Sequence, residues 1–267
     1  MTLARVLIAA GSDSGGGAGL QADVKTVTAL GAYAMTAVTA VTVQDTTGVS
    51  GIHAIPPDVI AAQMRVTLAD IGADCVKTGM LHSAAVIDAV VDALSAAPGI
   101  PLVVDPVMVA KGGARLIDDT AAAALIARLL PQAAIVTPNI PEAAALTGLS
   151  ITNADGQAEA GRRLLSMGAG AALVKGGHLD GPDLTDVLVT PDGIATYSGP
   201  RIDTRHTHGT GCTLASAIAA GLAQGMGLAD AVIRARTFVR RAIETAPGLG
   251  RGHGPLNHLH AIPPYGG

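Results

Sequence analysis

The chain has 267 residues, of which 49% are hydrophobic and 14% charged, with a formal net charge of −4 at pH 7. This length allows one large α/β domain or two small ones, but no apolar run reaches the roughly 18 to 20 residues of a membrane span without Gly, Pro or Asp interrupting it. Scattered Lys and Arg and an aromatic content of 1% exclude the basic stripe and the stacking surface of a nucleic-acid-binding protein.

Strand and helix patterns alternate along the chain, except where a run of β-branched strands interrupts the alternation in the first half. In chain order, we predict a strand at 5–10, a helix at 19–30, β-branched strands within 33–55 around a turn at 45–48, a helix at 57–70, a strand at 74–78, a helix at 84–95 and a strand at 101–105. The second half predicts a helix at 119–129, a strand at 134–137, a helix at 155–167, a strand at 171–175, a hairpin at 185–198, and helices at 211–224 and 228–245. This order predicts a mostly parallel sheet with helices on both faces, in a single domain over residues 1–267.

The cysteines and the first residues indicate a cytoplasmic protein. Cys75 and Cys212 have neither the spacing of a zinc site nor that of a disulfide framework, so free thiols in a reducing compartment are expected. The first ten residues lead directly into a strand and lack the apolar segment and cleavage site of a secretory signal.

The ends of the five parallel strands mark the expected ligand site. In open α/β sheets, ligands bind beyond the carboxyl ends of the strands. Each predicted strand is followed by Gly, Pro or a polar residue, in segments 10–13, 77–81, 104–108, 136–142 and 174–178. We expect these segments to meet at one rim of the sheet.

A seven-residue segment, 207–213 (THGTGCT), leads without a break into a helix of small residues. Glycines at a helix start let several backbone N–H groups face one point, where the helix dipole adds positive charge, so this segment predicts an anion site. Cys212 lies at its mouth, where the pKa of a thiol is expected to fall and the thiol could serve as base or nucleophile. The alternative is a tight turn with a small packed cysteine.

Five segments in this order resemble the hydroxymethylpyrimidine/phosphomethylpyrimidine kinases, which belong to the ribokinase-like superfamily. They are 11–23 (GSDSGGGAGLQAD), 105–109 (DPVMV), 137–143 (TPNIPEA), 175–178 (KGGH) and 208–213 (HGTGCT). The resemblance implies a three-layer α/β/α sandwich with a small β extension. It also implies transfer of the γ-phosphoryl group of Mg-ATP to 4-amino-5-hydroxymethyl-2-methylpyrimidine and then to its monophosphate, for thiamine diphosphate biosynthesis, by a cytoplasmic homodimer.

The phosphate end of the site follows from this resemblance. Gly209, Thr210 and Gly211 would form the anion hole, and Cys212 would stand where sugar-kinase relatives carry an aspartate base and would accept the proton of the acceptor hydroxyl. The ATP phosphates would also contact Lys175.

Two carboxylates complete this end in the resemblance. Asp105 and Glu142 would hold Mg²⁺ directly or through water, with Asn139 orienting phosphate or a metal-bound water. ATP binding is therefore assigned to Lys175, Asn139, Asp105, Glu142 and Thr210. For both carboxylates the alternative is helix capping.

The pyrimidine end needs a polar edge and apolar walls. Gln44 and Asp23 would supply the edge, and the walls would come from Gly11, Val43, Met80 and Val107. The alternatives are a solvent-exposed helix face for Asp23 and a core position for Met80.

The remaining residues of note are two histidines, the segment 252–260 and three residues that depart from the family pattern. His178 and His208 are given no proton-transfer role, and the segment 252–260 is interpreted as structural rather than metal-binding. The chain departs from the family at Asp45, where asparagine is usual, and at the pair Arg205 and His206, where lysine and asparagine are usual.

Three other functions stay open. A pyridoxine or pyridoxal kinase would perform the same reaction on another ring. A thiol hydrolase or acyltransferase would use Cys212 as nucleophile with His208 or His178 as base. A catalytically silent nucleotide-binding protein would bind ATP without turnover.

Overall fold

A computed structural model describes residues 3–109, 113 and 116–263. Its strands form one nine-stranded sheet in the order β3-β2-β1-β4-β5-β6-β7-β8-β9. The strands are β1 (Arg5–Ser12), β2 (Tyr33–Gln44), β3 (Val49–Ala54), β4 (Cys75–Thr78), β5 (Leu102–Val104), β6 (Ile135–Val136), β7 (Ala172–Val174), β8 (Asp183–Thr190) and β9 (Gly193–Pro200). The six strands β2, β1, β4, β5, β6 and β7 run parallel, while β3, β8 and β9 pair antiparallel at the two edges.

Apart from α5 (Ile140–Thr147), which is absent from the ranges predicted above, the helices begin within a few residues of the predicted positions. They are α1 (Gly19–Ala29), α2 (Pro57–Asp70), α3 (Ala84–Leu94), α4 (Asp119–Ala124), α5 (Ile140–Thr147), α6 (Ala154–Ser166), α7 (Thr210–Ala223) and α8 (Leu228–Glu244). The predicted helix at 119–129 changes within its length, since α4 passes into a π-helical turn, η1 (Leu125–Leu129), and a 3₁₀ turn, η2 (Leu130–Gln132). A last 3₁₀ turn, η3, spans His258–Ala261.

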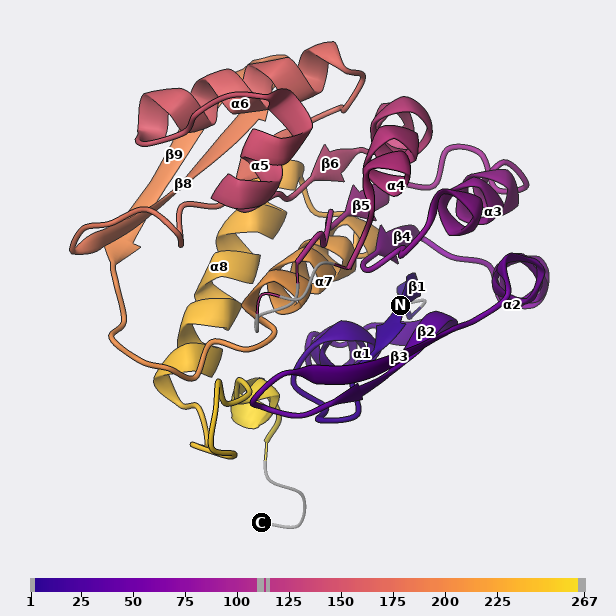
Figure 1. The fold of residues 1–267 in the computed structure, drawn as a ribbon, viewed down its shortest axis with the longest axis horizontal. Helices are drawn as coiled ribbons and strands as arrows, with labels where there is room; N and C mark the ends of the chain where they lie inside the picture. Colours follow the sequence, from indigo (N-terminus) through magenta and orange to yellow (C-terminus); the bar gives the residue numbers. More distant parts are fainter. Residues whose placement is uncertain (1–2, 110–112, 114–115, 264–267) are drawn as a thin grey trace.

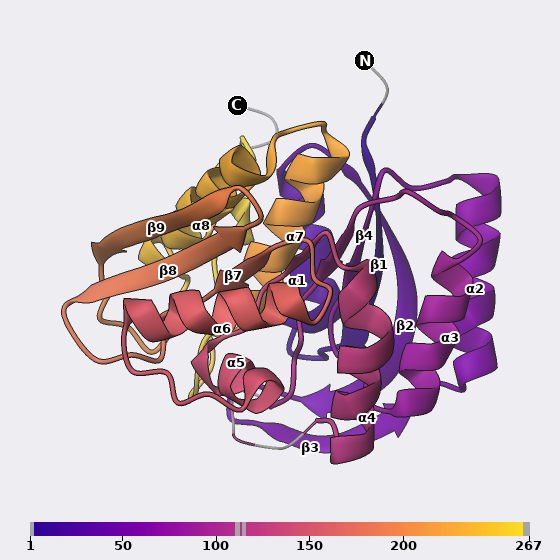
Figure 2. The same cartoon turned by 90° about the horizontal axis from the view of Figure 1, so that it is seen from above.

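The helices cover both faces of the sheet, so the predicted three-layer architecture is confirmed (Figures 1 and 2). Because successive strand residues face opposite sides, Leu7 and Ala9 of β1 join the core under α2 to α6, and Val6 and Ile8 join the core under α1, α7 and α8. All four side chains are fully buried.

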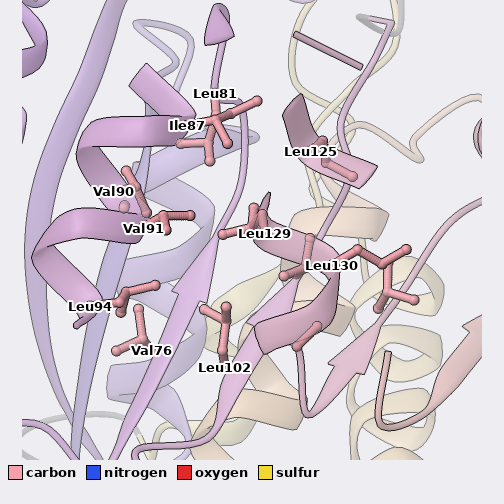
Figure 3. Packing of buried hydrophobic residues seen from close by; sticks show 14 of the residues in the cluster. Val76, Leu81, Ile87, Val90, Val91, Leu94, Leu102, Leu125, Leu129 and Leu130 are labelled. Atoms are coloured by element: carbon pink, nitrogen blue, oxygen red, sulfur yellow. The ribbon is translucent and has the colours of Figure 1, made fainter. Parts of the chain in front are cut away.

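The larger core lies between the sheet and α3, α4 and η1 (Figure 3). Val76 and Leu102 come from the sheet, and Ile87, Val90 and Leu129 come from the helical layer, with exposures of 3% or less. Burying a side chain of this size contributes about 1.5–3 kcal/mol, so this packing fixes the strands whose ends carry the candidate site.

Both predicted hairpins are present at the edges of the sheet. In the first, β2 pairs with β3 around a turn that is closed by a hydrogen bond from Asp45 N to Gly48 O. In the second, β8 pairs with β9 from Thr190 and Gly193 outward. Across the described residues, no helix combines the length and the apolar character needed to cross a membrane.

Candidate active site

The carboxyl ends of the parallel strands surround a cavity of about 510 Å³. All five predicted strand-end segments contribute to its lining, which confirms that they meet at one rim. The lining includes Gly11, Ser12 and Asp13 after β1, Lys77, Gly79 and Met80 at β4, Asp105, Val107 and Met108 after β5, Asn139, Pro141 and Glu142 after β6, and Lys175 and His178 after β7. The start of α7 closes the rim from the other face.

The loop before α7 and the glycine-rich loop after β1 touch at two glycines. Gly209, the residue before α7, has a φ of +86°. A Cβ at this position would lie 1.9 Å from the carbonyl oxygen of Gly17, so a larger residue does not fit. Gly211 and Cys212 line the cavity in the first turn of α7, where backbone N–H groups have no partner within the helix. This geometry fits an anion site.

The thiol of Cys212 lies at the mouth of this helix start and is half-buried. Burial raises the pKa of Cys212 to about 12, and the positive charge of Lys77 only partly opposes this effect. The expectation that the helix start lowers this pKa is therefore wrong for the unliganded chain, because the loss of solvation outweighs the helix dipole.

Lys175 and Asp105 form an ion pair against the first turn of α7. Lys175 Nζ lies 3.2 Å from Asp105 Oδ1, and the two side chains are 14% and 3% exposed. A Cβ at Gly211 would lie 3.2 Å from the same Nζ, which places the ammonium beside the anion site. Burial lowers the pKa of Lys175, but the carboxylates of Asp105 and Glu142 raise it by more. Lys175 therefore keeps its positive charge.

Asn139 and Glu142 start α5 as a capping box. Glu142 N donates to Asn139 Oδ1 over 2.9 Å, and Asn139 N donates to Glu142 Oε2 over 2.8 Å. Glu142 therefore caps the helix, as the alternative interpretation expected. Asn139 and Glu142 also line the cavity. Burial raises the pKa of Glu142 to about 7, with Lys175 opposing the rise and Asp105 adding to it.

The carboxylates suit Mg²⁺ better than zinc. Asp105 and Glu142 both line the cavity beside Lys175. In the part of the chain that the structure describes, no three His, Cys, Asp or Glu side chains gather into a metal-binding group. Mg²⁺ is commonly held by one or two carboxylates together with waters and substrate phosphates, whereas zinc needs three or four protein ligands. The donor set therefore fits a magnesium ion that arrives with a nucleotide.

Four of the predicted pyrimidine-site residues line the same cavity: Gly11, Gln44, Met80 and Val107. A Cβ at Gly11 would lie 2.5 Å from Met80 Cε, so the glycine leaves room for this methionine against the strand end. Gln44 Oε1 accepts a hydrogen bond from Thr42 Oγ1 over 3.1 Å, its Nε2 lies 3.4 Å from His208 Nε2, and the residue lines the cavity.

Val43 does not line the cavity, and its assignment to the wall is wrong. Its side chain is 62% exposed, whereas its neighbours Thr42 and Gln44 line the cavity. The pairing of β2 with β3 shifts its register between Val43 and Gln44, and Val43 lies on the exposed side of the strand.

Asp23 is also absent from the cavity lining, so its predicted role as a polar edge for the pyrimidine is wrong, and so is the exposed alternative. Its carboxylate is completely buried and accepts hydrogen bonds from Lys77 Nζ at 2.8 and 2.9 Å and from Ser216 Oγ at 2.7 Å. Lys77 is the group of this cluster that lines the cavity.

Asp13 and His208 form a buried pair that the sequence analysis did not find. Asp13 Oδ2 lies 2.8 Å from His208 Nε2, and the carboxylate also accepts hydrogen bonds from the backbone N–H groups of Gly15, Gly17 and Ala18. Burial raises the pKa of Asp13, but the His208 and backbone hydrogen bonds lower it by more. The pair ties the glycine-rich loop to the segment that starts α7.

The Asp13→Asn variant is expected to lose about 1–3 kcal/mol of unfolding free energy at pH 7, because a buried charged acceptor is removed. The folded-state pKa of Asp13 lies below its unfolded value, so its contribution is complete above about pH 4 and disappears as the pH falls through the folded-state pKa. Urea unfolding of both proteins from pH 7 to pH 3 measures this. A stability difference that does not shrink at low pH would contradict the assignment.

The segment near the carboxyl terminus holds the turn between β2 and β3. Gly252 N donates to Thr46 Oγ1 over 3.2 Å, and His253 N donates to Thr46 O over 2.8 Å. Asp45 Oδ1 accepts from Thr47 N over 2.7 Å, which is the turn-closing bond that an asparagine would also make. These contacts support the structural interpretation of the 252–260 segment and account for the departure at Asp45.

The comparisons with known protein families and with individual proteins point to the same family. The profile of the family described as phosphomethylpyrimidine kinase matches residues 13–257. The hydroxymethylpyrimidine/phosphomethylpyrimidine kinase of Bacillus subtilis is 43% identical over 260 residues, which cover 97% of this chain and 96% of that protein. The thiamine biosynthesis bifunctional protein ThiED of Geobacter sulfurreducens is 53% identical over 96% of this chain, and the chain spans about half (52%) of that protein.

A solved structure shows the same fold in a kinase with a different name. The pyridoxal kinase of Bacillus subtilis, solved as an ADP complex, superposes with a TM-score of 0.90 at 33% identity, over 97% of this chain and 98% of that one. The architecture is therefore the ribokinase-like fold expected from the sequence.

Proposed function

We propose that this chain, which belongs to the phosphomethylpyrimidine kinase family, uses the cavity at the strand ends for both steps of its kinase activity. It phosphorylates hydroxymethylpyrimidine and then the monophosphate for thiamine biosynthesis. The observation that carries the assignment of the site is that Lys175, Asp105, Glu142 and the start of α7 line one cavity together with Gln44 and Gly11.

The phosphate end provides charge and position, which phosphoryl transfer needs more than covalent chemistry. When bound, Mg-ATP supplies the phosphoryl group and a metal ion that neutralises its charge. Lys175 contacts the transferring phosphate as a point charge, and the N–H groups of Gly211 and Cys212 receive its oxygens. Asp105 and Glu142 would hold the metal through carboxylate oxygens, with Asn139 keeping Glu142 in place.

The pyrimidine end positions the acceptor oxygen. Gln44 pairs with the polar edge of the ring, and Gly11, Met80 and Val107 enclose its faces. Cys212 then takes the proton of the hydroxymethyl group as it attacks the phosphoryl group. Since the pKa of Cys212 is about 12, the thiolate that can act as base is a small fraction at pH 7. In the second transfer the acceptor is already a phosphate oxygen, and no proton has to leave it.

The thiol hydrolase is the weaker alternative. His208 is paired with Asp13 rather than with the thiol. The silent nucleotide-binding protein is disfavoured because Asp105, Glu142, Lys175 and Cys212 all line one cavity.

Pyridoxal phosphorylation is the alternative with a specific observation in its favour, the TM-score of 0.90 to a pyridoxal kinase. Measurement of ADP release with the pyrimidine alcohol, its monophosphate and pyridoxal separates the two. We expect the highest kcat/KM with the pyrimidine alcohol. A higher kcat/KM with pyridoxal would overturn the proposed substrate.

The assembly and the location are proposed on separate grounds. Val41 and Val43 are 45% and 62% exposed on one face of β2, which supports the expected homodimer. Light scattering should then give twice the 26.4 kDa of the chain, and a monomer mass would contradict it. The two free cysteines support a cytoplasmic location.

A further inference from the structure

Lys175 leaves the end of β7 at the point where this strand stops pairing with β8. The register of the two strands ends at the pair Val174 and Val187. The backbone beyond this pair still needs hydrogen-bond partners, because a buried N–H or C=O group without a partner costs free energy. Buried side chains supply these partners on both sides of Lys175, the residue that contacts the transferring phosphate in the proposed function.

Asp186, on β8, holds the peptide group that follows Lys175. The N–H of Gly176 donates to Asp186 Oδ1 over 2.9 Å, and Asp186 is only 5% exposed. A Cβ at Gly176 would lie 1.9 Å from the carbonyl oxygen of Thr185, so this glycine lets the chain lie directly against β8. The carboxylate therefore fixes the backbone immediately after the lysine.

The peptide group that precedes Lys175 is held at both of its polar atoms. Lys175 N donates to Pro138 O over 2.9 Å, and Val174 O accepts from Gln157 Nε2 over 2.9 Å. Gln157 is completely buried and lies on α6, on the face of the sheet opposite to α8 (Figures 1 and 2). The backbone on both sides of Lys175 is thus fixed by groups outside the strand.

The charge of Asp186 is neutralised outside the cavity. Arg236 Nε, on α8, lies 2.8 Å from Asp186 Oδ2, and Arg236 Nη2 donates to Tyr197 O over 2.9 Å. Asp186 and Arg236 are both absent from the cavity lining, whereas Lys175 belongs to it. An effect of Asp186 on a ligand in the cavity therefore has to pass through the backbone at Gly176 and Lys175.

We propose that Asp186 is a positioning residue, which holds the backbone at Gly176 and thereby keeps the Lys175 ammonium at the transferring phosphate. This inference rests on the proposed function, in which Lys175 contacts that phosphate. A displacement of about 1 Å can reduce a rate by about 100-fold, so the loss of one backbone hydrogen bond can have a large effect. The competing explanation is an ion pair that only joins β8 to α8.

Two double variants separate the hydrogen bond from the ion pair. Asp186→Asn with Arg236→Met removes both charges and keeps a side-chain oxygen for the N–H of Gly176. Asp186→Leu with Arg236→Met removes the charges and that oxygen. Neither protein contains the unpaired buried charge that a single substitution would leave. If the leucine protein does not fold, the smaller Asp186→Ala with Arg236→Met takes its place.

Steady-state kinetics give kcat and KM for Mg-ATP and for the pyrimidine alcohol, and thermal unfolding compares the stabilities. We expect the asparagine variant to keep kcat/KM for Mg-ATP within about threefold of wild type, and the leucine variant to lose about 10- to 100-fold. The KM of the alcohol should stay at its wild-type value in both, because the residues proposed to bind the ring are unchanged.

Three results would overturn the role of Asp186: equal losses in the two double variants, no loss in either, or a loss that appears mainly in the KM of the alcohol. An ion pair with a structural role alone gives the first or the second of these, since both variants lack it. A wild-type protein that phosphorylates neither the alcohol nor its monophosphate would instead refute the proposed function, and this shows before any variant is compared.

Discussion

Cys212→Ala is expected to lower kcat with the pyrimidine alcohol by about 100- to 10,000-fold, the usual contribution of a general base. Nucleotide binding should survive, because the groups that face the phosphates at the start of α7 are backbone N–H groups, and Lys175 is unchanged. Isothermal calorimetry with ADP and steady-state assays with the alcohol measure the two effects separately. Cys75→Ala is the matched control, since this thiol is buried in the core and is not part of the cavity lining.

The pH dependence of the same reaction tests whether the thiolate acts as base. Below a pKa of about 12, the thiolate fraction of Cys212 rises tenfold for each pH unit. The wild-type kcat/KM with the alcohol should therefore increase from pH 6.5 to pH 9. With the monophosphate, whose own pKa is near 6, the increase should stop above about pH 7. An unchanged kcat in Cys212→Ala, or identical pH profiles for the two acceptors, would exclude Cys212 as the base.

Gly209→Ala is expected to abolish activity and to cost at least about 3 kcal/mol of unfolding free energy. The alanine Cβ would lie 1.9 Å from the carbonyl oxygen of Gly17, so the glycine-rich loop and the start of α7 would have to separate. It would also force an L-residue into a φ of +86°, which alone costs about 1–2 kcal/mol.

A matched control isolates the clash from the backbone conformation. Gly225 has a φ of +80°, and a Cβ there would meet nothing within 4 Å. Gly225→Ala should therefore cost only about 1–2 kcal/mol and leave kcat unchanged. Chemical unfolding and assays of both variants give the comparison. Equal costs for the two substitutions would show that the contact between Gly17 and Gly209 does not hold the site together.

The architecture could be predicted because local patterns determine it. The alternation of short β-branched runs with amphipathic segments predicted the parallel sheet, both hairpins and the rim at the strand ends. The π-helical turn at Leu125–Leu129 was not predicted, because nothing in the helical pattern there separates it from α4.

The errors in the site came from contacts between distant residues and from strand register. Asp23 was assigned to the pyrimidine through the family resemblance, and its pairing with Lys77 was missed because the two residues are 54 positions apart and no local spacing connects them. The pair of Asp13 and His208, 195 residues apart, was missed for the same reason. Val43 was assigned to the wall, but it lies on the exposed side of β2, beside a register shift between Val43 and Gln44 that the sequence does not indicate.

The most direct test of the account follows the phosphorus atoms of the wild-type reaction. Phosphorus NMR of the protein with Mg-ATP and the pyrimidine alcohol should show a phosphate monoester first and a diphosphate later, with one ADP formed for each transfer. ATP that is bound and not consumed, or ADP that forms without any phosphorylated pyrimidine, would contradict the assignment of this cavity as a two-step kinase site.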